Sequence, residues 1–127
     1  MIKAIKAVAL GLSLLLATFS VCSAQDFQKG LEAYDANYAA GLNLQKGLEA
    51  YNAKDYAEAL RQFRLLAEQG WASGQYFLGE MYDHGKGVTQ DYKEAARLYR
   101  LSAEQGLKLA QTNLGEMYDH GKGVTQD

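Results

Sequence analysis

The stretch "LGEMYDHGKGVTQD" stands at Leu78–Asp91 and is repeated without change at Leu114–Asp127. The two copies are 36 residues apart, and the match extends beyond them, because AEQG stands at Ala67–Gly70 and again at Ala103–Gly106. A fixed period of this size is typical of stacked repeats, in which each unit is one supersecondary element that packs on the next. The period therefore predicts a repeat architecture.

One helix of each unit is expected to begin after an aspartate. Asp91 is followed three residues later by Glu94, the spacing of a capping box in which the aspartate accepts a hydrogen bond from a first-turn amide. Apolar residues then recur at helical spacing on one face, and Gly106 supplies the left-handed residue that often ends a helix. Residues Asp55–Gly70 repeat this order, with Glu58 in the box.

The other helix of each unit, which comes first in the chain, is expected over residues 73–82, where apolar side chains share one face. Gly79, like Gly115 in the next copy, lowers helix propensity by about 1 kcal/mol relative to alanine. Its use at both positions predicts a close approach between helices. In the loop that follows, Gly85 and Gly87 allow positive φ angles and a sharp change of chain direction.

These units resemble Sel1-like repeats, which are relatives of the tetratricopeptide repeat. The resemblance rests on Gly74–Gly79 with Tyr82, on the glycine loop and aspartate of Gly85–Tyr92, and on AEQG at Ala103–Gly106. It implies an all-α fold, a right-handed α-α superhelix of helix pairs. The expected boundaries are a tetratricopeptide-like repeat at 44–70, a Sel1-like repeat at 71–106, and an incomplete Sel1-like repeat, first helix and loop only, at 107–127.

The first 24 residues have the layout of a secretory signal peptide. Lys3 and Lys6 make a basic start, residues 7–21 are mostly apolar and uncharged, and cleavage is predicted after Ala24. The apolar run is short for a membrane span, so no stable span is expected after signal removal. The signal peptide therefore predicts that the protein is periplasmic or secreted. Acylation of Cys22, the only cysteine, is the alternative; after cleavage at the predicted site no cysteine remains for a disulfide.

A shorter duplication precedes the repeats, because QKGLEAY stands at Gln28–Tyr34 and again at Gln45–Tyr51. The offset of 17 residues corresponds to one helix rather than to one repeat unit. Residues 25–43 are therefore predicted to form an extra helix that caps the N-terminal end of the stack, since terminal units of solenoids are usually atypical. A loosely held helix is the alternative.

The charge pattern and the motifs argue against several classes of function. The chain carries 13 Lys+Arg against 15 Asp+Glu without a basic block, so nucleic acid is not expected as a partner. His84 and His120, the two histidines, lack the further converging ligands of a metal site. The segment Gly85–Gly87 lacks the Ser or Thr of a phosphate loop, and no serine has a His/Asp constellation. The sequence predicts no enzyme, cofactor or metal.

The resemblance implies a non-catalytic adaptor that mediates protein–protein interactions in a bacterial cell envelope. Its first helices would line a concave groove that binds a protein or peptide. The expected partner-binding residues are Gln75, Tyr76, Glu80 and Asp83, with Gln111, Thr112, Glu116 and Asp119 as their counterparts in the next unit.

Two other readings stay open. Some cysteine-rich members of this repeat family have been linked to binding or hydrolysing β-lactams, but the predicted mature chain has no cysteine. The last unit lacks its second helix, which predicts either that the chain is a fragment of a longer array or that its open C-terminal end self-associates.

Overall fold

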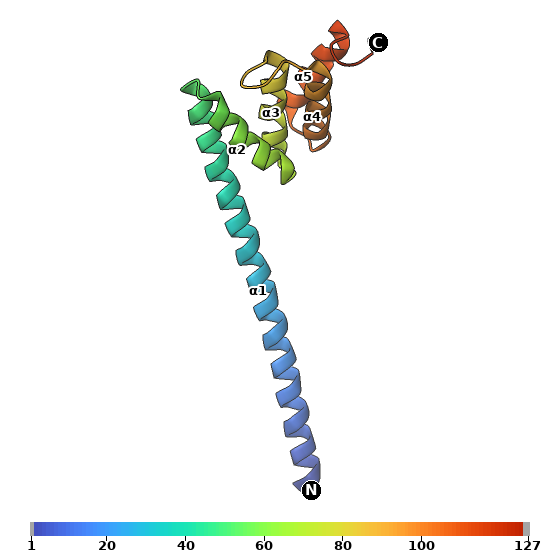
Figure 1. Ribbon diagram of the computed structural model, residues 1–127. Coiled ribbons are helices and arrows are strands. Elements are labelled where there is room, and N and C mark those ends of the chain that lie inside the picture. The colour runs from blue at the N-terminus through green and yellow to red at the C-terminus, as the bar shows by residue number, and fades with distance from the viewer. Residues whose placement is uncertain (1, 126–127) are drawn as a thin grey trace. The chain divides into compact units, whose positions relative to one another are not determined.

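The computed structural model describes the backbone of residues 2–125 and the side chains of residues 24–125. This part of the chain contains five helices and no strand (Figure 1). The helices are α1 (Ile2–Asn52), α2 (Tyr56–Glu68), α3 (Ala72–His84), α4 (Tyr92–Glu104) and α5 (Lys108–His120). The all-α fold that the resemblance implies is confirmed for the described residues. The chain divides into two units, Met1–Tyr38 and Ala39–Asp127, which are described separately below.

The N-terminal unit differs from its predicted organisation. Helix α1 continues through residue 43, so residues 25–43 are not a separate helix. The reason is local: this stretch contains no proline, and a single interior glycine such as Gly41 costs too little, about 1 kcal/mol, to end a helix. The side chains of residues 24–39 are exposed. The capping role of residues 25–43 stays a prediction.

Signal cleavage after Ala24 also stays a prediction, because the side chains of residues 1–23, Cys22 included, lie outside the described part of the chain. Residues 126–127 lie outside it as well. Within the described residues, no helix combines the length and the apolar character that crossing a membrane requires.

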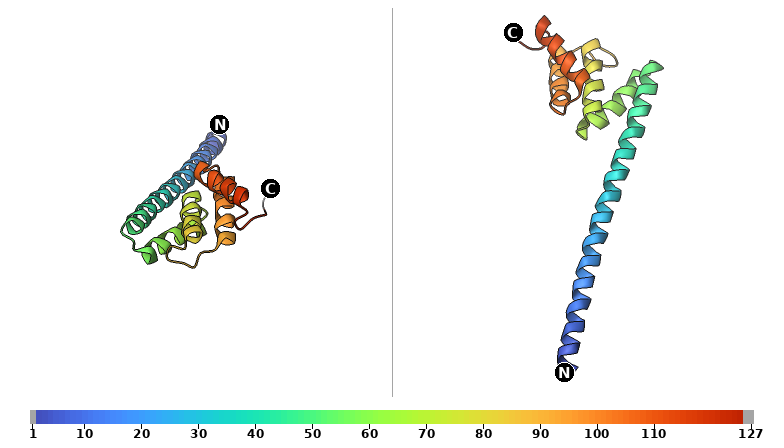
Figure 2. Two further views of the ribbon diagram at one scale, coloured as in Figure 1. Left: turned by 90° about the horizontal axis from the view of Figure 1, so that it is seen from above. Right: turned by 180° about the vertical axis from the view of Figure 1, so that it is seen from behind.

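In the second unit, helices that follow one another in the chain pack on one another: α2 on α3, α3 on α4 and α4 on α5 (Figure 2). One apolar cluster joins Phe63 of α2 to Met81 of α3, with Leu48 and Tyr51 at the end of α1 packed against it. A second cluster surrounds Tyr99 of α4 and is shared by α3, α4 and α5. Phe63, Met81 and Tyr99 are fully buried, so the core lies between successive helices.

The predicted N-caps are confirmed. The Asp91 carboxylate accepts hydrogen bonds from the amides of Lys93 and Glu94, both at 3.1 Å, and the Asp55 carboxylate accepts one from the Glu58 amide at 3.2 Å. These bonds satisfy first-turn donors that have no partner inside the helix.

The second half of the capping box is absent in these two helices. The Asp91 amide donates instead to the carbonyl of Tyr82 at 2.9 Å, which ties the start of α4 to the end of α3. The Glu94 carboxylate is therefore available to Arg97, whose Nη2 lies 2.6 Å from Glu94 Oε1. Glu58 pairs with Arg61 in the same way at 2.8 Å.

The glycines at the ends of helices behave as predicted. Gly106 has a φ of +92°, its amide donates to Ala103, and the next amide donates to the Ser102 carbonyl. This is the Schellman pattern of a left-handed helix end. Gly85 and Gly87 have φ angles of +63° and +71° and turn the chain after α3.

Gly79 and Gly115 occupy equivalent positions in identical sequences but have different surroundings. A Cβ on Gly79 would lie 2.9 Å from the ring of Tyr99, which confirms the predicted close approach between α3 and α4. A Cβ on Gly115 would meet no atom within 4 Å. No described helix covers α5 at this position as α4 covers α3.

Candidate functional site

A pocket of about 250 Å³ opens between α3 and α5. The two helices contribute residues from equivalent positions of the repeat, since Glu80 and Glu116 are 36 residues apart, as are His84 and His120. The lining residues are Glu80, Asp83, His84, Asn113, Glu116, Met117, His120 and Lys122. The repeat thus brings the polar faces of two successive first helices together.

Hydrogen bonds hold the α3 carboxylates in place. The hydroxyl of Tyr99 lies 3.2 Å from Asp83 Oδ2 and 3.5 Å from Glu80 Oε1, so its proton can serve either acceptor. Asn113 Nδ2 donates to Glu80 Oε1 at 2.9 Å. A carboxylate with fixed donors has a defined orientation toward a ligand.

The Tyr99 hydroxyl remains a donor over the whole physiological range. Burial raises its pKa far above the ordinary value, and the charges of Glu80 and Asp83 raise it further, against the opposite effect of Asn113. Burial also raises the pKa of Tyr76. The phenol beneath the pocket is therefore a neutral, permanent hydrogen-bond donor.

The charge of the pocket is negative. Three carboxylates, those of Glu80, Asp83 and Glu116, face a single ammonium group, that of Lys122. Among the residues whose side chains are described, no group of three or more His, Cys, Asp or Glu is arranged to hold a metal ion. This arrangement favours an organic cation, such as a lysine or arginine side chain, over an anion.

Two of the predicted binding residues, Gln75 and Tyr76, are buried. Gln75 is 6% exposed and its Oε1 accepts a hydrogen bond from Gln105 Nε2 at 2.8 Å. Tyr76 is 8% exposed and packs its ring against Phe77 and Tyr99, with centroids 5.0 and 5.9 Å apart. Their predicted exposure is wrong, because α4 covers this part of α3.

Their counterparts in α5 are exposed, but they bond within their own chain. Gln111 Nε2 donates to the Ala103 carbonyl at 3.1 Å, and the Thr112 hydroxyl donates to the Lys108 carbonyl at 3.0 Å. Asp119 is exposed but does not line the pocket. Of the eight predicted residues, the pocket contains three: Glu80, Asp83 and Glu116.

Sequence reasoning missed the contribution of Asn113. This residue stands where the preceding unit has Phe77, directly before the two identical stretches begin, so a polar side chain replaces an aromatic one there. This change from an aromatic to a polar residue was the sequence signal that could have identified Asn113. His84 and His120 are the last residues of α3 and α5, and both line the pocket with exposed side chains.

The structure is that of an all-α repeat protein. Its helices α2 to α5 have 13 residues each, and glycines with positive φ follow them and turn the chain toward the next helix. A family model for the Sel1 repeat matches residues 72–107 and 108–127, so this part of the chain consists of Sel1 repeats. The resemblance predicted from the glycine loop and AEQG is confirmed.

Solved structures agree with this assignment. The chain is 36% identical to c5321, a protective antigen of uropathogenic Escherichia coli that displays an SLR fold, with a TM-score of 0.66 over 69% of this chain and 20% of that chain. It is 29% identical to a Sel1 repeat protein from Oxalobacter formigenes, with a TM-score of 0.65 over 69% of this chain and 70% of that chain. A search of curated proteins found no match.

Proposed function

We propose that this chain is an exported, non-catalytic adaptor of the bacterial cell envelope that binds a protein partner through the α3–α5 pocket. Sel1 repeat proteins mediate protein–protein interactions, which supports the class of function. The observation that carries the choice of surface is the oriented carboxylate pair of Glu80 and Asp83, held by Tyr99 and Asn113. The partner presents a lysine or arginine side chain to these groups.

The composition of the pocket supports binding rather than catalysis. Its lining holds no serine, threonine or cysteine that could act as a nucleophile, and His84 and His120 are exposed at its rim. Charge-assisted hydrogen bonds from a guanidinium or ammonium group to the two carboxylates are the interactions this surface offers. No observation in the pocket favours β-lactam chemistry.

The pocket is tested with an array of peptides that differ only in a central Lys, Arg, Ala or Glu. We expect the full chain to retain the Lys and Arg peptides most strongly, because their charge complements the carboxylates. The double variant Glu80→Gln, Glu116→Gln should weaken that binding at least tenfold, measured by fluorescence anisotropy.

A matched control removes the same charge elsewhere. Glu68 and Glu104 are exposed at the ends of α2 and α4 and do not line this pocket, so Glu68→Gln, Glu104→Gln should leave binding within twofold. Equal retention of all four peptides, or equal losses in both double variants, would contradict the assignment of this surface.

Export is tested by the intact mass of the protein isolated from its native cells. We expect a mass that begins at Gln25, because the predicted cleavage follows Ala24. A mass that retains the first 24 residues would disprove cleavage, and a mass that begins at Cys22 with added acyl chains would show lipidation instead.

A further inference from the structure

An exposed apolar stripe runs along the N-terminal unit. Phe27, Leu31, Tyr34 and Tyr38, here called the α1 stripe, are spaced by four, three and four residues and so share one face of the helix. They are 69%, 42%, 67% and 62% exposed. A row of large apolar side chains in contact with water is typical of a surface that binds another molecule.

The sequence of the stripe has an internal precedent. Gln28–Tyr34 is identical to Gln45–Tyr51, and both copies form the same side-chain hydrogen bond from a glutamine to a glutamate four residues later. In the second copy, Leu48 and Tyr51 pack into the cluster that contains Phe63 of α2. This heptapeptide therefore has a face suited to contact with another helix.

The two copies differ at their glycines. A Cβ on Gly47 would lie 2.5 Å from the Phe63 ring, so this glycine lets an aromatic ring reach the backbone of α1. Gly30 is the equivalent residue, and a Cβ there would meet no described atom within 4 Å. The first copy therefore has the same glycine, over which an aromatic ring fits, and no described ring lies there.

We propose that the α1 stripe pairs with the α1 stripe of a second copy of this chain. Alternating steps of four and three residues form the seam through which two identical helices interlock. A two-fold contact of this kind is self-complementary, so each copy supplies aromatic rings to the Gly30 of the other. The pairing goes beyond the proposed adaptor function and uses none of the pocket residues.

Charge favours this occupant over a lipid surface. Between residues 25 and 38 the only cation is Lys29, against Asp26, Glu32 and Asp35. Helices that lie on anionic membranes carry several Lys or Arg side chains on the polar face. A mildly acidic polar face with an aromatic seam fits a protein helix instead.

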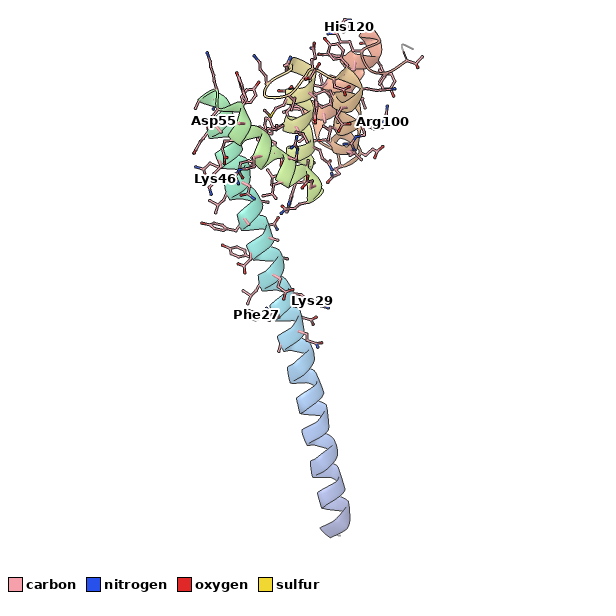
Figure 3. All side chains as sticks on the ribbon, viewed as in Figure 1. Phe27, Lys29, Lys46, Asp55, Arg100 and His120 are labelled. Carbon is pink, nitrogen blue, oxygen red and sulfur yellow. The ribbon has the colours of Figure 1, made fainter. Side chains whose placement is uncertain are left out.

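Photo-crosslinking of the full chain in living cells tests the pairing. Benzoylphenylalanine at position 34 places the reactive group on the stripe, and at position 29 it places the group on another side of α1, as the labelled Phe27 and Lys29 show (Figure 3). We expect an adduct of twice the chain mass from position 34 and at least tenfold less from position 29.

A second pair of variants separates the seam from the fold of the helix. With the probe kept at position 34, Leu31→Asp should reduce the dimer adduct at least tenfold, because it places a charge in the seam. Glu32→Gln, on the polar face, should leave it within twofold, and so should the pocket variant Glu80→Gln, Glu116→Gln. No adduct, an adduct only with other proteins or with lipid, or equal yields from positions 29 and 34 would overturn the proposal.

Discussion

Replacing Phe63 by alanine should lower the free energy of unfolding by about 3–5 kcal/mol. The Phe63 side chain is fully buried and stacks on Phe77 with ring centroids 5.0 Å apart. It also fills the space above Gly47, so its loss opens a cavity where α1, α2 and α3 meet. Urea titration followed by circular dichroism measures the change.

The control lies two residues further along the same helix. Leu65 is 43% exposed, so Leu65→Ala should change the free energy of unfolding by less than about 1 kcal/mol. Similar losses for Phe63→Ala and Leu65→Ala would contradict the position of α2 in the core.

Gly79→Ala and Gly115→Ala should change stability in opposite directions although the neighbouring sequence is the same. At position 79 the added methyl would meet the fully buried ring of Tyr99, which cannot move aside, and such overpacking destabilises by about 1–3 kcal/mol. At position 115 it would meet no described atom, so the better helix propensity of alanine should stabilise by up to about 1 kcal/mol.

Thermal and urea unfolding of the two single variants give this comparison directly. Each variant controls for the other, because the substitution and the flanking residues are identical. Destabilisation of the same size at both positions would show that a helix covers Gly115 as α4 covers Gly79.

Local rules predicted the parts of the fold that depend on a few neighbouring residues. Asp55 and Asp91 begin helices because a carboxylate can reach the next two or three amides, whatever lies further away. Gly85 and Gly106 have positive φ because a residue without a Cβ adopts that conformation with little strain. These features could be predicted from sequence for that reason.

The failures concern neighbours that are distant in the chain. Tyr76 and Thr112 stand at equivalent positions, yet Tyr76 is buried and Thr112 is exposed, because α4 covers this face of α3 and no described helix covers the equivalent face of α5. The pattern of one helix does not state which later helix will cover it. Glu94 does not accept a hydrogen bond from the Asp91 amide as the capping box predicts, because that amide donates to a carbonyl of α3. This contact, too, is between residues of different helices.

The candidate pocket was predicted in part. The period places Glu80 and Glu116 on the same side of the stack, and this relation follows from the sequence alone. The hydrogen bonds that orient Glu80 come from Tyr99 and Asn113, which belong to two other helices. Their convergence depends on packing and could not be deduced from spacing.

The loops that follow α3 and α5 make the same contacts in both units. Lys86 and Lys122 lie over the rings of Tyr56 and Tyr92 at 5.5 and 5.3 Å from the ring centroids. Gly87 approaches the backbone of Tyr56, as Gly123 approaches that of Tyr92.

Because these junctions repeat, a gene that gained or lost one 36-residue unit would rejoin surfaces that already fit each other. The two identical fourteen-residue stretches place the same junction residues at both ends of such a unit. Unequal exchange could therefore change the number of units in this array in a single genetic event, without requiring a new interface to evolve.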